Sequence, residues 1–299
     1  MAEKLKIKLA PHRSIADSLR VIPYDTLRDR VVACCLEAAY NLPAEVLSAL
    51  KAAFEKESSV IGKECLAQCI DNAAIAAQER MPLCQDTGIA VFFVEMGEYV
   101  RLDRGSIYEA ISEGVEIGYQ KGFLRKSMVT DPLFKRKNTK TNRPPIIHLH
   151  LVPGDKIQVT LAPKGGGSEN MSALRMLKPS EGREGVKKFV VESVIAAGGN
   201  PCPPTIVGVG IGGNFEESAL LAKKALLRPL GQPNEDPDYA ALEQEILAEI
   251  NASGVGPQGL GGDVTSLAVH IDYLPCHIAS MPVAVNLNCH AARHASFEL

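Results

Sequence analysis

The first eighty residues of the chain have the periodicity of helices. Apolar residues recur every three to four positions between charged ones, which predicts helices over 28–40, 44–57 and 58–80. Beyond residue 80 the pattern changes to short apolar runs bounded by turn residues, which predict strands. These runs cover residues 89–94, 146–152, 157–161, 205–209, 267–273 and 283–287. Further helices are predicted over residues 106–122, 179–198, 215–227 and 239–250.

The order of these elements predicts an α+β fold, in which a helical N-terminal region packs on a mixed β-sheet with further helices. A chain of 299 residues can bury the core of one large domain or of two smaller ones. No repeat and no low-complexity linker interrupts it. We therefore expect a single domain over 1–299, mainly helical in 1–80 and mixed in 81–299.

Composition narrows the class of partner and the compartment. The net charge of −3 argues against nucleic acid, because phosphate binding usually requires a basic face. No apolar run is long enough to span a membrane, and residues 1–8 are charged where a signal peptide would be apolar. We therefore expect a cytoplasmic protein whose eight cysteines are thiols rather than disulfides.

Three of the cysteines share a setting. Cys84 lies in a polar turn directly before a predicted strand, Cys202 lies between prolines before another, and Cys289 directly follows a third. Proline on both sides keeps Cys202 out of any helix. Four others lie in apolar helices, where free cysteine commonly packs as a small hydrophobe, although Cys65 and Cys69 could instead clamp a metal at i, i+4. Cys276 is ambiguous.

Two glycine-rich stretches also carry candidate chemistry. The three glycines at 165–167 expose backbone N–H groups, which suits either an anion-binding loop or a plain flexible loop. Gly208, Gly210 and Gly213 formally match a dinucleotide-binding motif. Such a site also needs a second strand ending in an acid about twenty residues on, and that interval holds a helix and prolines. We expect these glycines to form a tight strand-to-helix turn instead.

The long intervals between Cys84, Cys202 and Cys289 do not suit a zinc knuckle or a ferredoxin, whose ligands cluster in sequence. They suit a cluster assembled by the whole fold. A 4Fe-4S cluster held by three thiolates leaves one iron without a protein ligand, which can act as a Lewis acid. Zinc, a cysteine nucleophile and structural thiols remain open on spacing alone.

Several specific stretches carry a resemblance that covers nearly the whole chain. They are LCQDTG at 83–88, LR at 124–125, KGGGSEN at 164–170, NPCPP at 200–204, GPQG at 256–259 and NC at 288–289. With them the chain resembles the alpha subunit, equivalent to the N-terminal domain, of class I fumarate hydratases, the iron-sulfur hydro-lyases. The resemblance implies a 4Fe-4S cluster with Cys84, Cys202 and Cys289 as its ligands.

The same resemblance implies a substrate pocket for malate and fumarate. Gln85, Arg125, Gly167 and His277 match substrate-binding positions, and Asp86 matches a catalytic position that can place or relay a proton. Arginine can donate two parallel N–H bonds to a carboxylate, and exposed glycine N–H groups can hold another. The open iron would draw electron density from the departing hydroxyl while a base removes the neighbouring proton.

In the family that base belongs to a C-terminal domain, which the sequence to Leu299 does not contain. We therefore expect a separate beta subunit, a hetero-oligomer and a small dicarboxylate substrate. The alternatives are the alpha subunit of an L-tartrate dehydratase, a related enzyme, and a non-catalytic subunit that binds the cluster for structure or sensing. The stretch 167–170 resembles the fumarase form, and retention of Gln85, Asp86 and Arg125 argues against the sensing alternative.

Overall fold

The computed structural model describes residues 19–299, so the charged segment 1–8 lies outside the described part. The three predicted N-terminal helices are confirmed. They are α1 (Tyr24–Tyr40), α2 (Ala44–Lys56) and α3 (Val60–Glu79). Helix α3 begins after Ser59, whose side chain accepts a hydrogen bond from the Gly62 N–H.

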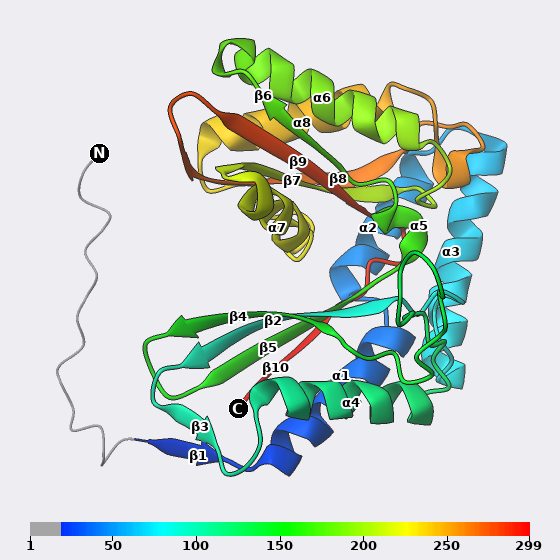
Figure 1. The fold of residues 1–299 in the computed structure, drawn as a ribbon. Helices are drawn as coiled ribbons and strands as arrows, with labels where there is room; N and C mark the ends of the chain where they lie inside the picture. The colour runs from blue at the N-terminus through cyan, green and yellow to red at the C-terminus, as the bar shows by residue number, and fades with distance from the viewer. Residues whose placement is uncertain (1–18) are drawn as a thin grey trace.

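A four-stranded sheet follows, with the order β10-β5-β2-β4. Its strands are β2 (Ile89–Gly97), β4 (Ile146–Val152), β5 (Ile157–Lys164) and β10 (Ala295–Glu298). Helices α1 and α4 (Ile107–Lys121) cover one face, and their apolar residues form a core with those of β2 and β5. Because β2 is central, the run Ala90–Val94 is fully buried. A short parallel pair, β1 (Arg20–Ile22) and β3 (Val100–Leu102), lies beside this sheet (Figure 1).

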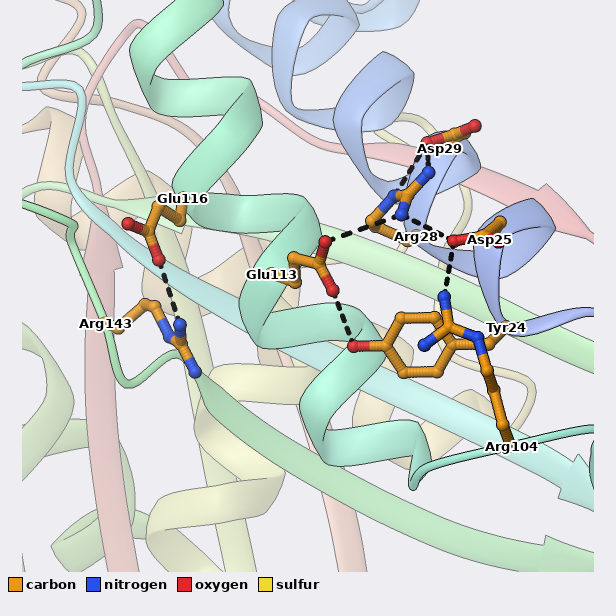
Figure 2. A network of polar contacts seen from close by, with 8 residues as sticks. All are labelled: Tyr24, Asp25, Arg28, Asp29, Arg104, Glu113, Glu116 and Arg143. Carbon is orange, nitrogen blue, oxygen red and sulfur yellow. Dashed lines mark hydrogen bonds and ion pairs between the residues drawn. The ribbon is translucent and has the colours of Figure 1, made fainter.

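A polar network joins α1 to α4 at the edge of this core (Figure 2). The Tyr24 hydroxyl donates to Glu113 at 2.7 Å, and Arg28 contacts both Asp25 and Glu113. Burial, followed by the hydrogen bond to Glu113, raises the pKa of Tyr24 to about 12. Since most of the ion pairs are partly exposed, they orient the helices more than they stabilise them.

A second four-stranded sheet has the order β6-β9-β7-β8. Its strands are β6 (Ala173–Leu177), β7 (Thr205–Gly213), β8 (Ser266–Cys276) and β9 (Met281–Asn288). Helices α6 (Gly182–Ala197) and α8 (Pro237–Asn251) cover one face, and α7 (Phe215–Ala225) covers the other (Figure 1). Both sheets mix parallel and antiparallel pairs, so the predicted α+β class is confirmed.

The expectation for Gly208 and Gly210 was wrong in one respect. Both lie inside β7 rather than in the turn that follows it. A Cβ on Gly210 would lie 2.0 Å from the Ser218 carbonyl oxygen, and one on Gly208 would lie 2.1 Å from that of Ala222. These glycines therefore let the backbone of α7 approach β7 closely. Gly212 and Gly213, with φ of 86° and 63°, are the last two residues of β7, directly before the turn into α7.

Within residues 19–299, only the range 24–56 is long and apolar enough by composition to cross a membrane. In the structure this range is two helices, α1 and α2, separated by residues 41–43. Nine residues of α1 are buried, among them Leu27, Val31 and Cys35. The range is therefore a weak membrane signal, because core helices have the same composition.

Candidate functional site

The second sheet brings the turns of Cys202 and Cys289 to one end. Strand β7 begins three residues after Cys202, and β9 ends one residue before Cys289. These two strands are antiparallel neighbours in which Ile206 pairs with Asn288. The start of one strand therefore lies beside the end of the other, and each polar turn continues from the same edge.

The first sheet brings the Cys84 turn and the glycine loop 165–167 to one of its ends. Strand β2 begins shortly after Cys84, and β5 ends at Lys164, directly before the loop. The pair is antiparallel, with Ile89 opposite Lys164. The loop then enters α5 (Gly166–Glu169), a single helical turn.

These two sheet ends meet at α5, which lies between them (Figure 1). The Asp86 carboxylate accepts the Gly166 N–H at 2.6 Å. The residue predicted to be catalytic therefore contacts the predicted anion-binding loop. A Cβ on Gly167 would lie 3.1 Å from the carbonyl oxygen of Asn200, two residues before Cys202. The glycine loop is thus a close neighbour of two of the three cysteine turns.

Gln258 ties the Cys202 turn to the residues after Cys289. Its backbone N–H donates to the Pro203 carbonyl at 2.8 Å, and its side-chain amide lies 3.1 Å from Nδ1 of His290. The His290 backbone N–H donates to the Cys202 carbonyl at 3.3 Å. Cys202 and Gln258 both have a φ of 54°, a conformation that non-glycine residues adopt at a cost. Strained residues held by several contacts are common at functional sites.

The three cysteine thiols lie close enough to affect one another. Burial, then the neighbouring Cys289 and Cys84, raises the pKa of the Cys202 thiol. The pKa of Cys289 is also raised by burial, although the nearby Arg293 acts in the opposite direction. Cys69 on α3 lies near this group, and its pKa rises to about 12 mainly through burial. All eight cysteines are free thiols.

The donor set fits an iron-sulfur cluster better than a single ion. Within residues 19–299, no three His, Cys, Asp or Glu side chains converge tightly enough to hold one metal ion. A cluster spreads its thiolates over several iron atoms, so they need not point at one centre. Half-buried Cys84 and Cys289 and exposed Cys202 come from three separate turns, which suits such a spread.

A partly buried ion network supports the glycine loop. Lys164 donates to the Ser168 hydroxyl at 2.8 Å and lies 3.3 Å from a carboxylate oxygen of Glu169. Lys223 donates to both oxygens of Glu169, at 2.6 and 2.7 Å, and Asn286 donates to one of them. Burial lowers the pKa of Lys164 to about 8. Burial alone would raise the pKa of Glu169, but its cationic and amide neighbours lower it to about 2.

Two of the remaining predicted substrate-binding residues lie beside the Cys84 turn, and the third lies far from it. Gln85 is exposed beside Cys84, with its Oε1 3.5 Å from that sulfur. The side chain of Arg125 is exposed, and its carbonyl accepts the Thr87 hydroxyl at 2.8 Å, next to the Cys84 turn. His277 lies in the β8–β9 turn. Because β8 runs parallel to β7, this turn lies at the C-terminal end of β7, whereas Cys202 precedes the N-terminal end. The two ends of β7 are eight residue steps apart, at about 3.3 Å each, so roughly 26 Å separates them.

The structure therefore leaves His277 at the far end of the second sheet and brings the other predicted site residues together, namely Cys84, Gln85, Asp86, Arg125, Gly167, Cys202 and Cys289. These residues form an open face, since Gln85, Arg125, Gly166 and Cys202 are exposed. Two cavities lie away from this face. One of about 730 Å³ is lined by α7, by residues 228–237 and by the end of β8, and one of about 530 Å³ lies between the end of α7 and the first sheet.

No role was predicted for several residues that build this site. They are Lys164, Glu169, Gln258, Asn286, His290 and Arg293. The first three lie within the stretches that carry the family resemblance and His290 directly follows one, whereas Asn286 and Arg293 lie outside them. Local pattern gave no signal for Arg293 or Asn286, because their partners are more than a hundred residues away in the chain.

Three thiols, a carboxylate and a glycine loop thus lie together where the two sheets meet. The sequence profile described as Fumarate hydratase (Fumerase) matches residues 28–298, and the chain belongs to this family.

Two named relatives match most of this chain. A putative L(+)-tartrate dehydratase subunit alpha from Methanocaldococcus jannaschii is 46% identical over 275 residues, which cover 90% of this chain and 96% of the relative. The L(+)-tartrate dehydratase subunit alpha of Escherichia coli K12 is 35% identical over 258 residues, covering 86% of this chain and 85% of the relative.

Proposed function

We propose that the chain is the alpha subunit of a cytoplasmic iron-sulfur hydro-lyase that adds water reversibly to fumarate, forming malate. The observation that carries the proposal is the meeting of the Cys84 and Cys202 turns with the glycine loop, through the contacts of Asp86 with Gly166 and of Gly167 with Asn200. The family match supports the same reaction class.

In this proposal Cys84, Cys202 and Cys289 hold a 4Fe-4S cluster. When bound, the cluster supplies a Lewis acid for the departing hydroxyl. Arg125, exposed beside the site, would hold one substrate carboxylate with its two parallel donors. Gly167, in an exposed loop at the start of α5, would offer backbone N–H to the other carboxylate.

Asp86 would position a proton in the pocket. Its two carboxylate oxygens accept the N–H groups of Gly88 at 3.1 Å and Gly166 at 2.6 Å, which fixes the orientation of the carboxylate. The naming of the relatives as alpha subunits supports a partner beta subunit, which would supply the main base.

L(+)-tartrate is the second candidate substrate, because the relatives at 46% and 35% identity are named for it. The stretch 167–170, with its resemblance to the fumarase form, favours fumarate. The chain should be purified anaerobically together with its beta subunit and assayed for malate from fumarate and oxaloacetate from tartrate. We expect kcat/KM for fumarate to exceed that for tartrate at least tenfold. The reverse ratio would make it a tartrate dehydratase, and a loaded complex inactive on both would support the non-catalytic alternative.

The ligand set is tested by three single variants, Cys84→Ser, Cys202→Ser and Cys289→Ser. We expect each to lose most of the iron and acid-labile sulfide of the wild-type complex, because a hydroxyl is a poor replacement for a thiolate ligand. Cys276→Ser is the matched control, since Cys276 is an exposed thiol at the far end of β8. Full cluster content in any one of the three variants would remove that cysteine from the set.

A further inference from the structure

Arg293 links the turn of Cys289 to the turn of Cys84. It lies four residues after Cys289, and only 4% of it is exposed. Its Nη2 donates to the backbone carbonyl of Asp86 at 2.9 Å, two residues from Cys84. The guanidinium is thus a buried connection between two of the three cysteine turns.

This connection uses only part of the donor capacity of Arg293. Its Nε and Nη1 are buried and have no hydrogen-bond partner among the described residues. Arginine stays charged in proteins, so the side chain places both a positive charge and two unused donors inside the protein. Buried donors and charges are costly unless paired, which indicates an anionic partner that residues 19–299 do not supply.

Arg228 is a partly buried arginine that has a charged partner. It too has a buried Nε without a hydrogen bond, but its Nη2 donates to Glu243 at 2.6 Å, and that carboxylate balances its charge. Arg293 instead lies near the thiol of Cys289 and has no carboxylate partner among the described residues. The anion that completes its surroundings therefore belongs to the cysteine site.

We propose that Arg293 is a positioning residue for the cluster, which holds the Cys84 and Cys289 turns together and directs its free donors and charge to the thiolates and the anionic cluster. The inference rests on the proposed function. A positive charge close to the cluster stabilises the reduced, more negative form more than the oxidised form. Arg293 should therefore raise the reduction potential of the cluster and slow its loss.

The test compares Arg293→Met, Arg293→Lys and the wild type as complexes purified anaerobically with the beta subunit. The readouts are iron and sulfide per chain, the midpoint potential from an EPR-monitored titration, the rate of cluster loss to an iron chelator, and thermal melting without the cluster. Arg175→Met is the matched control, because Arg175 is exposed on β6 and stacks on Phe189.

We expect Arg293→Met to make one-electron reduction about tenfold less favourable, a potential lower by about 59 mV. We also expect it to lose the cluster at least fivefold faster. Arg293→Lys, which keeps the charge, should retain a potential close to that of the wild type and lose the cluster at an intermediate rate. If Arg293→Met is too unstable to purify, Arg293→Lys carries the test. A wild-type rate of cluster loss in that variant would contradict a role for the free Nε and Nη1 donors of Arg293.

Wild-type potential and wild-type loss rate in both Arg293 variants would overturn the inference and leave the proposed function intact. An equal change in Arg175→Met would overturn it as well, because the effect would then not be specific to the site. Absence of any cluster from the wild-type complex would instead refute the proposed function and the inference together.

Discussion

At the scale of single residues, Glu169 balances the charge of two lysines beneath the glycine loop. We expect Glu169→Gln to lower the free energy of unfolding by about 1–2 kcal/mol at pH 7, since hydrogen bonds to charged groups are strong but 37% of this side chain is exposed and screened. Chemical denaturation measures this. The exposed Glu184→Gln is the control, and should change stability by less than about 0.5 kcal/mol.

The stabilisation that Glu169 contributes has a defined pH dependence. The folded pKa of Glu169, about 2, lies below the ordinary value of 4.5, so its contribution is fully present above pH 4.5 and is lost as the pH falls toward 2. The difference in stability between wild type and Glu169→Gln should therefore shrink steadily between pH 5 and pH 3. A difference that is constant over this range would show that the charge of Glu169 is not what matters.

At the scale of elements, α7 packs against β7 through glycine. We expect Gly210→Ala to destabilise the protein by about 1–3 kcal/mol, because the new methyl group would overlap the Ser218 carbonyl and push the helix away. Thermal melting measures the loss. Gly231→Ala is the control, since its surroundings are open and only its φ of 89° is strained. If Gly210→Ala costs no more than the control, the close approach is not required.

Element prediction succeeded where periodicity was strong. The bounds of β4 are those predicted, and α4 lies within the predicted range, with Ser106 and Glu109 forming a capping box at its start. Strands β1, β3, β6 and β10 were missed because each has only three to five residues, too few to show a clear alternation. Strand β7 was predicted too short, because its glycines were interpreted as a turn.

At the scale of the whole molecule, the position of His277 sets a condition on its expected role. No side chain spans roughly 26 Å, so His277 can contact a substrate only at the site of another copy of the chain. We expect co-expression of His277→Ala with Cys84→Ser chains to recover part of the activity that each variant lacks alone. No recovery, with full activity of His277→Ala by itself, would remove His277 from the site.

The amino-acid sequence was sufficient to identify the chemical groups of this protein and their local settings. Cys84, Cys202 and Cys289 were recognisable because each lies in a polar turn at a strand end, which is a property of neighbouring residues. The family match covers residues 28–298.

Tertiary structure alone decided which of these groups meet. The antiparallel pairing of β7 with β9 and of β2 with β5 brings the turns together, and it also separates His277 from them. The contact of Arg293 with Asp86 spans 207 residues, and that of Asn286 with Glu169 spans 117. Such contacts follow from strand register and from the packing of two sheets, which depend on the whole chain at once and leave no periodic signal in any one segment.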